Sequence, residues 1–183
     1  NTIPDTVGQY VATLTGGCTR SAMGVALDGA NGYIDLGLGS ITFGGGPMTV
    51  VMNVAWDVLN AWTRIFCCGP VCSEDHNTIA LNNQNTASQF RFMVSSGGNN
   101  AMSASSALET RKTYHIVGTV TDTQMVLYID GVPHGNHIGS GLEPAAVPRA
   151  QCYIGQYSTQ YFKGLVSSLR IYSGAMTAAQ VLT

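Results

Sequence analysis

Short segments of alternating apolar and polar residues dominate this chain of 183 residues, and clusters of Gly, Asn, Asp and Ser separate them. Such alternation buries one face of a strand and leaves the other in water. The pattern predicts strands at 9–15, 24–27, 33–36, 48–56, 63–68, 78–81, 89–94, 113–120, 124–129, 151–154 and 164–172. So many short strands predict an all-β antiparallel sandwich of two sheets, formed by residues 1–183 as a single domain.

The strongest local signal is a hairpin. Residues 125–129 form a β-branched and aromatic run that is followed by Asp-Gly at 130–131. Asp-Gly accommodates the two positive φ angles of a type I′ turn, so the pair predicts a two-residue hairpin loop. Asn-Gly at 31–32 and Gly-Gly at 97–98 predict two further turns.

One short C-terminal helical turn is expected. Thr177 and Gln180 have the spacing of a capping box, in which each side chain accepts a hydrogen bond from the backbone N–H of the other residue. Met176 and Val181 occupy the flanking hydrophobic positions that pack against each other across such a cap. This predicts that the sandwich ends in a single capped turn.

Charged residues make up 10% of the chain, with 8 Lys+Arg and 10 Asp+Glu, against about 25% in ordinary soluble domains. The shortage of cations argues against a nucleic acid partner, because phosphate binding needs a dense basic patch. It also argues against polybasic attachment to a membrane. No apolar run reaches the ~18–20 residues of a membrane span, so no membrane insertion is expected.

Five cysteines occur in the chain: Cys18, Cys67, Cys68, Cys72 and Cys152. They favour an oxidising compartment, and hence a protein that is secreted, extracellular or at the cell surface. All five are disulfide candidates, and because the number is odd at least one thiol is free or bonded to another chain. Adjacent strand residues point to opposite faces, so Cys67 and Cys68 are expected to have different fates. The spacing does not choose among the roughly fifteen arrangements of two bonds.

A metal site is the alternative use for some of these thiols. Cys68, Cys72 and His76 recur at intervals of four, with Cys67 alongside, which provides enough nitrogen and sulfur ligands for Zn²⁺. The competing interpretation is a disulfide across the turn from Cys68 to Cys72, with His76 in an unrelated loop. An oxidising compartment favours the disulfide.

Several motifs follow one another in a fixed order. They are A-L-D-G at 26–29 with Y-I-D-L-G at 33–37, M-N-V-A-W at 52–56, W-T-R-I-F at 62–66, H-I-V-G-T-V at 115–120 with L-Y-I-D-G at 127–131, I-G at 154–155, F-K-G-L at 162–165, and L-R-I-Y at 169–172 with A-M-T at 175–177. Together they resemble the laminin G-like domains of the concanavalin A-like superfamily. The resemblance implies a two-sheet jelly roll, a fold that hosts lectins, adhesion modules, matrix proteins and glycanases, so it implies no single activity.

The chain departs from this family pattern at acidic positions. Ser167-Ser168 replaces the usual acidic pair. Gln180 stands where a Glu is usual, and Cys67-Cys68 replaces Asp-Phe. Some relatives hold a structural Ca²⁺ with acidic side chains, so the serine pair argues against an inherited calcium site at that position.

Calcium is the second metal for which the sequence offers ligands. The acidic loop residues supply the hard oxygen ligands that Ca²⁺ prefers, and Asp28 and Asp75 are the candidates. The alternative is that an aspartate such as Asp28 supports a turn through its side-chain oxygens. The sequence favours this second interpretation.

The chain lacks the motifs of common hydrolases and nucleotide-binding enzymes. A glycosidase needs two carboxylates on either side of the scissile bond. The only adjacent acids are Glu74 and Asp75, whose side chains would point to opposite faces of a strand. The chain contains no G-x-S-x-G, no H-E-x-x-H and no P-loop motif. It is therefore not expected to be an enzyme.

Sugar binding requires an aromatic face beside neutral hydrogen-bonding groups. The loop at 155–162 offers that mixture, and amide-rich turns add planar groups that suit pairs of hydroxyls. The competing interpretation of the loop tyrosines is ordinary half-buried packing. Trp56 and Trp62 are interpreted as core or seam residues, because each lies beside a strand. The candidate ligand-binding residues are Tyr157, Gln156, Tyr161, Asn83, Asn99 and Asn100.

Two functional hypotheses follow. The first is an extracellular, non-catalytic binding or adhesion module that recognises a glycan or a surface protein through its rim loops. The second is a structural subunit of a fibre, sheath or matrix, because sparse charge weakens the repulsion that prevents self-assembly and an unpaired cysteine offers an intermolecular disulfide. A divergent glycanase is a third and weaker hypothesis.

Overall fold

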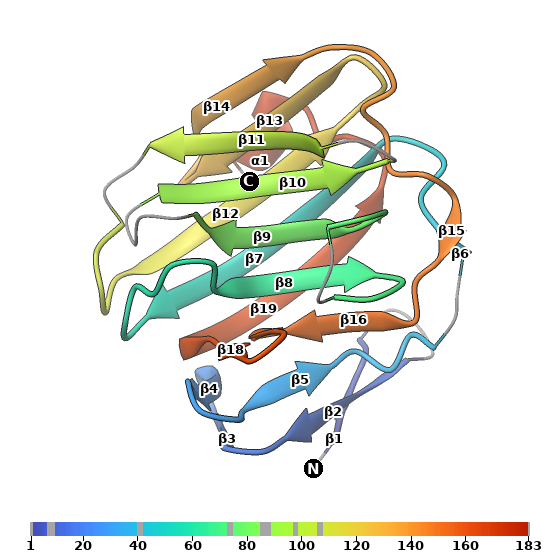
Figure 1. The fold of residues 1–183 in the computed structure, drawn as a ribbon. Coiled ribbons are helices and arrows are strands. Elements are labelled where there is room, and N and C mark those ends of the chain that lie inside the picture. Colours follow the sequence, from blue (N-terminus) through green and yellow to red (C-terminus); the bar gives the residue numbers. More distant parts are fainter. Residues whose placement is uncertain are drawn as a thin grey trace.

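The computed structural model describes residues 2–6, 10–39, 42–72, 75–84, 89–96, 99–105 and 108–182. Two antiparallel sheets face each other, as predicted, and we call them the front sheet and the back sheet after their positions in Figure 1. The front sheet holds, in spatial order, β1 (Thr2–Pro4), β2 (Val11–Thr15), β5 (Tyr33–Asp35), β16 (Gln151–Ile154), β8 (Arg64–Gly69), β9 (Ile79–Asn83), β10 (Gln89–Ser95) and β11 (Asn99–Ser105).

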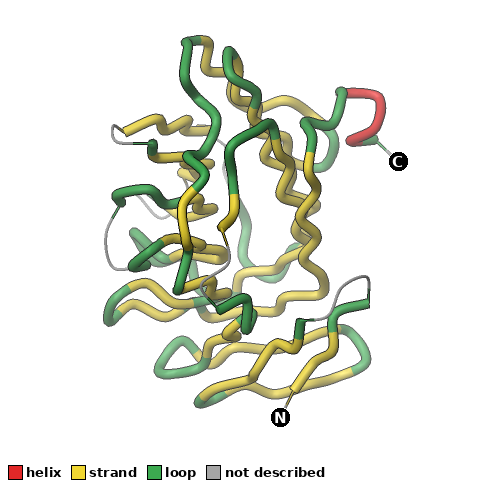
Figure 2. Tube along the Cα trace, turned by 90° about the vertical axis from the view of Figure 1, so that its right-hand side faces the viewer, coloured by secondary structure: helices red, strands yellow, loops and turns green. Residues whose placement is uncertain are grey.

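The back sheet has seven strands and forms the second layer, which Figure 2 shows edge-on beside the first. Its spatial order is β14 (Val132–Ile138), β13 (Gln124–Ile129), β12 (Thr113–Val120), β7 (Met48–Trp56), β19 (Lys163–Ser173), β4 (Gly24–Asp28) and β3 (Cys18–Ser21). Two small ribbons complete the structure, one of β6 (Thr42–Phe43) with β15 (Val147–Pro148), the other of β17 (Gln156–Tyr157) with β18 (Gln160–Tyr161). The all-β two-sheet prediction is confirmed.

All eleven predicted strands are present, and four of them, β7, β12, β13 and β16, have the predicted bounds. The sequence pattern missed the edge strands β1, β3, β11 and β14 and the four strands of the small ribbons. An edge strand has a neighbour on one side only and buries little of its surface, so its residues need not alternate. β14 illustrates this, because all seven of its residues are exposed or partly exposed.

The Asp-Gly hairpin is confirmed. Asp130 and Gly131 have φ angles of 51° and 78°, as a type I′ turn requires, and they join β13 to β14. The Asn-Gly pair at 31–32 has a different role, because it connects β4 of the back sheet to β5 of the front sheet. The Gly-Gly pair at 97–98 lies outside the described residues.

The predicted helical turn is α1 (Ala178–Val181). The Thr177 N–H donates to Gln180 Oε1 at 2.9 Å, and the Gln180 N–H donates to Thr177 Oγ1 at 3.4 Å, which confirms the capping box. Val181 is buried and Met176 partly buried in one cluster on the outer side of the back sheet. Figure 2 shows the helix outside that sheet.

Trp56 lies at the centre of the core between the sheets and is fully buried. Its ring makes edge contacts with Phe90, Tyr114 and Phe162 at centroid distances of 5.6, 6.0 and 5.9 Å. Its Nε1–H donates to Asn83 Oδ1 at 3.0 Å, which satisfies the one polar atom of the indole. The interpretation of Trp56 as a core residue is confirmed.

Two disulfides form, Cys67–Cys72 and Cys68–Cys152, and Cys18 is free. Cys68 points into the core and Cys67 does not, which confirms that the adjacent cysteines have different fates. Cys68 and Cys152 are register partners on neighbouring strands β8 and β16, so the bond ties two strands that are far apart in sequence. The proposed Cys68–Cys72 bridge and the zinc alternative are both wrong, because these thiols are used in other bonds.

Candidate functional site

Arg64, Asn82 and Arg91 form a row on the outer face of the front sheet. Arg64 pairs with Asn82 across β8 and β9, and Asn82 pairs with Arg91 across β9 and β10. Directly opposed residues of antiparallel strands share a face, so the register alone brings the three side chains together. Phe90 and Phe92 flank Arg91 in sequence and point the other way, into the core.

Arg64 is held firmly in place. Its side chain is 2% exposed, and its guanidinium donates to the Asp75 carboxylate and, at 3.2 Å, to Cys67 Sγ. The guanidinium carbon lies 3.7 Å from the centroid of the Tyr157 ring, a close cation–π contact. Burial lowers the pKa of Arg64, and the adjacent Asp75 carboxylate opposes that shift. Arg64 is therefore a fixed cation whose charge is neutralised within the site.

The Cys67–Cys72 disulfide closes the loop that leads to Asp75. It anchors the loop to β8, and the Cys72 N–H donates to Gln151 Oε1 at 2.7 Å on β16. Asp75 follows three residues later and reaches Arg64. Asp75 was a candidate calcium ligand, but its carboxylate serves as the partner of a buried arginine.

Arg91 and Trp62 form the other side of the site. Arg91 Nε–H donates to Asn82 Oδ1 at 3.3 Å, and its guanidinium carbon lies 5.7 Å from the Trp62 ring centroid. Trp62 has a φ of 61° and is 36% exposed, so its ring is available at the surface. Its interpretation as a core or seam residue is wrong, because the loop before β8 turns the indole away from the sandwich interior.

The β17–β18 ribbon adds a tyrosine and an amide. Tyr157 is directly opposed to Gln160, and Gln156 to Tyr161, so the two pairs occupy opposite faces of the ribbon. Tyr157 and Gln160 line the site. Gln156 and Tyr161 face away from it, and Gln156 Oε1 is buried without a hydrogen bond to the described residues.

These groups surround a depression of about 360 Å³ on the front sheet, which we call the front depression. It combines two aromatic rings, two guanidinium groups, one carboxylate and two amides. The lining residues are Trp62, Arg64, Asp75, Asn82, Arg91, Tyr157 and Gln160. Such a site can hold a flat ligand that bears hydroxyl groups, because the ligand's apolar face can stack on the aromatic rings and its hydroxyls can bind the planar polar groups.

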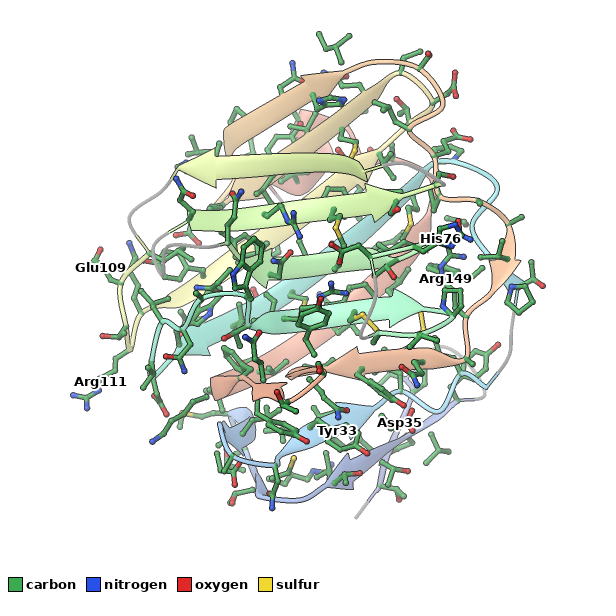
Figure 3. All side chains as sticks on the ribbon, viewed as in Figure 1. Tyr33, Asp35, His76, Glu109, Arg111 and Arg149 are labelled. Atoms are coloured by element: carbon green, nitrogen blue, oxygen red, sulfur yellow. A yellow bond between two sulfur atoms is a disulfide. The ribbon has the colours of Figure 1, made fainter. Side chains whose placement is uncertain are left out.

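A second aromatic pair lies on the same face of the sheet. Tyr153 is the register partner of Cys67 on one side and of Asp35 on the other. Its ring meets that of Tyr33 edge-on at a centroid distance of 5.3 Å. Figure 3 shows Tyr33 and Asp35 on β5, beyond β16 as seen from β8. Aromatic and polar side chains thus continue from the front depression toward β5.

Of the candidate ligand-binding residues whose side chains the structure describes, Tyr157 alone lines the front depression, together with the calcium candidate Asp75. Asn83 is directed into the core, where it accepts from Trp56, and this is a correction to its predicted role. The side chains of Asn99 and Asn100 lie outside the described part of the structure. Arg91 was missed, although a charged residue between two phenylalanines already indicates an outward position on a strand.

Asp28 supports a turn, which is the interpretation that the sequence favoured. Its Oδ1 accepts from the backbone N–H groups of Ala30, Asn31 and Gly32 at 2.9, 3.1 and 2.9 Å. These hydrogen bonds lower the pKa of Asp28. Within the described residues, no group of three His, Cys, Asp or Glu side chains is placed to hold a metal ion.

The lowered pKa of Asp28 predicts a pH dependence of stability. A carboxylate whose pKa is lower in the folded state stabilises the fold above its unfolded pKa of about 3.9 and loses that contribution as pH falls through the folded value. Asp28→Asn keeps the acceptor oxygen but not the charge. We expect the variant to be less stable than the wild type at pH 7 and equally stable in strong acid, as measured by urea unfolding across pH. A difference that does not depend on pH would contradict this.

Cys18, the free cysteine, is half-buried beside a second depression of about 320 Å³ near β1 and β3. Its Sγ lies 3.1 Å from the Thr15 carbonyl oxygen and 3.3 Å from that of Tyr33. Burial raises the pKa of the thiol. The thiolate is the form that attacks disulfides, so this environment disfavours the intermolecular bond considered for the unpaired cysteine.

None of the helices in the described ranges is long and apolar enough to span a membrane.

The two antiparallel layers and the aromatic and polar depression on one outer face define a lectin-like β-sandwich. A family model described as "Concanavalin A-like lectin/glucanases superfamily" matches residues 28–182. The chain belongs to this superfamily, which confirms the resemblance seen in its motifs. No curated protein sequence matches the chain significantly.

Solved structures show the same fold. The chain is similar to domain 4 of AbnA, an extracellular GH43 arabinanase from Geobacillus stearothermophilus in complex with arabinotriose, with TM-score 0.80, 21% identity and coverage of 97% of this chain and 90% of that one. It is similar to a native heptameric SAP-like pentraxin from Limulus polyphemus, with TM-score 0.60, 20% identity and coverage of 80% and 72%. It is also similar to Trypanosoma rangeli sialidase, with TM-score 0.70 and 19% identity. That match covers 96% of this chain but 29% of the sialidase chain, so this chain spans less than a third of that enzyme.

Proposed function

We propose that this chain is a non-catalytic, extracellular carbohydrate-binding module whose glycan lies in the front depression. The observation that carries the proposal is the exposed Trp62 ring beside the Asn82, Arg91 and Gln160 side chains on a rigid sheet. A sugar ring has apolar C–H faces that stack on an aromatic ring and hydroxyl groups that bind planar polar groups. Both surfaces are available here within one site.

The rigidity of the site supports binding. The guanidinium carbon of Arg64 lies 3.7 Å from the centroid of the Tyr157 ring, and Arg64 is buried and ion-paired. These two side chains therefore lose little conformational freedom when a ligand binds. The solved domain of the arabinanase was obtained with arabinotriose, which supports a sugar ligand for a chain of the same fold. The Tyr33–Tyr153 pair on the same face offers room for an oligosaccharide longer than one residue.

The non-catalytic part of the proposal rests on the carboxylates. Hydrolysis of a glycosidic bond uses a pair of carboxyl groups about 5–5.5 Å or 6.5–9.5 Å apart. Asp75 is the only carboxylate among the described residues that line the front depression, and it is ion-paired with Arg64. The expected outcome is binding without release of reducing ends when the protein is incubated with polysaccharides.

The extracellular part of the proposal is supported by Cys67–Cys72 and Cys68–Cys152, because disulfides persist in oxidising compartments. The protein should therefore be isolated from its native source with both bonds formed. Intact mass before and after reduction measures this directly. Fully reduced cysteines in the native material would contradict an extracellular location.

Trp62→Ala tests the site. Burying an aromatic ring against a ligand is worth about 1.5–3 kcal/mol, so we expect the variant to bind its glycan roughly 10- to 100-fold more weakly. A glycan array with and without EDTA identifies the ligand, and calorimetry then compares the variants. Tyr172→Ala, which removes an exposed aromatic residue of β19 on the back sheet, is the matched control and should bind as the wild type does.

Two outcomes would overturn the proposal. One is the absence of binding to any glycan in both conditions. The other is glycan binding that Trp62→Ala leaves unchanged, because the ligand would then lie elsewhere on the molecule.

A further inference from the structure

The front depression contains a large share of the positive charge of this chain. Only six arginines and two lysines occur in 183 residues, yet two of the arginines, Arg64 and Arg91, lie in one depression of about 360 Å³. Their register on β8 and β10, with Asn82 between them on β9, keeps both on the same face of the sheet. This concentration sets the kind of ligand that the site can prefer.

The charge of Arg64 is already neutralised. The Asp75 carboxylate pairs with it, and the Tyr157 ring covers its guanidinium. Arg64 is 2% exposed and so offers almost no surface to a ligand. Its role is to position Tyr157 and Asp75 at the edge of the site.

Arg91, in contrast, has no ion-pair partner among the described residues. Its Nε–H donates to Asn82 Oδ1. Its terminal Nη groups have no hydrogen-bond partner in the same ranges. The Arg91 side chain is partly buried, and this burial lowers its pKa, while the nearby Asp75 carboxylate, which is paired with Arg64, opposes the shift. In a partly buried position a ligand charge interacts more strongly with the guanidinium. Two guanidinium groups and one carboxylate leave the depression with a net positive charge.

A guanidinium with two free N–H groups matches the geometry of a carboxylate, which it binds through two parallel hydrogen bonds. Arg91 lies 5.7 Å from the centroid of the Trp62 ring, so a sugar stacked on the indole would bring its substituents within reach of the guanidinium. We propose that the front depression prefers glycans with a carboxylate, such as uronic or sialic acids, and that Arg91 binds that carboxylate. This inference rests on the proposed function of the same site.

Matched pairs of acid and methyl ester test it, because the ester keeps the sugar ring and removes the charge. The probes are trigalacturonic acid, sialyllactose and a hyaluronan oligosaccharide, each compared with its ester by calorimetry at low and at physiological salt. For the pair that the protein binds, we expect the acid to bind about tenfold or more tightly than the ester, as charged hydrogen bonds do relative to neutral ones. Added salt should reduce the ratio.

Arg91→Gln tests whether Arg91 is the group that produces the preference for the acid over its ester. The variant should bring the ratio of acid to ester affinity close to one, and Arg91→Lys should recover part of the preference, because lysine retains the charge but not the paired geometry. Arg170→Gln, which removes an exposed arginine of β19, is the control and should leave the ratio unchanged.

The outcomes separate the two proposals. Equal binding of acid and ester in every pair, with Trp62→Ala still weakening it, would overturn the preference for acids and retain the glycan site. A preference for acids that survives Arg91→Gln would overturn the assignment to Arg91. Failure to bind any probe or any neutral glycan would overturn both the preference and the proposed function.

Discussion

Replacing Cys68 and Cys152 together by alanine will lower the free energy of unfolding by about 4 to 5 kcal/mol in the chain-entropy description of disulfides. The bond joins residues 84 positions apart, so its loss frees a long loop in the unfolded chain. At about 2–4 °C per kcal/mol for a domain of this size, the melting temperature should fall by roughly 8–20 °C. Denaturant and thermal unfolding of the non-reduced proteins measure both quantities.

The second disulfide supplies the control. Cys67 and Cys72 are 5 positions apart, and removing a loop constraint this short costs about 2 kcal/mol in the same description. The pair Cys67→Ala and Cys72→Ala should therefore destabilise the fold by less than half as much. Equal losses in the two double variants would show that loop length does not determine the stabilisation.

Trp56→Ala will have an effect of similar size, because it empties the centre of the core. Large aromatic residues replaced by alanine in cores cost about 3–5 kcal/mol, from lost burial and from the cavity left behind. Trp56 is fully buried, its ring contacts Phe90, Phe162 and Tyr114, and its indole N–H binds Asn83. We therefore expect the loss of stability for Trp56→Ala to lie in the upper part of that range. Urea unfolding at neutral pH gives the value.

Trp62→Ala is the matched control, since the same atoms are removed at a surface position. Trp62 is 36% exposed and contacts Arg91 through a long cation–π distance, so the loss should stay under about 1 kcal/mol. A large loss of stability at Trp62, or a small one at Trp56, would contradict the roles assigned to the two tryptophans.

The front depression combines groups from three kinds of structure. Adjacent strands of the front sheet set the row from Arg64 to Arg91 by register. A disulfide-closed loop brings Asp75 to Arg64, and the β17–β18 ribbon places Tyr157 over its guanidinium. The residues that form the site come from separate segments of the chain, yet each segment is held in place by strand pairing or by a disulfide. Such a site is organised before a ligand arrives.

The sequence predicted the strands that are rich in apolar and β-branched residues. β7, β12, β13 and β16 were predicted with their bounds because each is such a run flanked by turn or polar residues. The capping box and the Asp-Gly hairpin were predictable for a related reason, since both depend on residues next to each other in the chain. The edge strand β14 was missed because its exposed and partly exposed residues form no such run.

The candidate site was predictable only in part. Tyr157 was identified from its loop composition, but its neighbours Gln156 and Tyr161 face away, because the pairing of β17 with β18 decides which residues share a face. Asn83 is a core residue for the same reason: one position along β9 separates it from the outward Asn82. Sequence composition does not reveal which face a residue occupies when the register is unknown.

By itself, the sequence determined the all-β sandwich, its C-terminal turn, the superfamily and the separate fates of Cys67 and Cys68, because alternation and local motifs act over a few residues. Only the tertiary structure decided the disulfide partners and the grouping of Trp62, Arg64 and Arg91. These depend on the order of strands within the front sheet, which is set by packing between segments far apart in the chain. Local chemistry therefore specifies the strands, whereas long-range pairing creates the site.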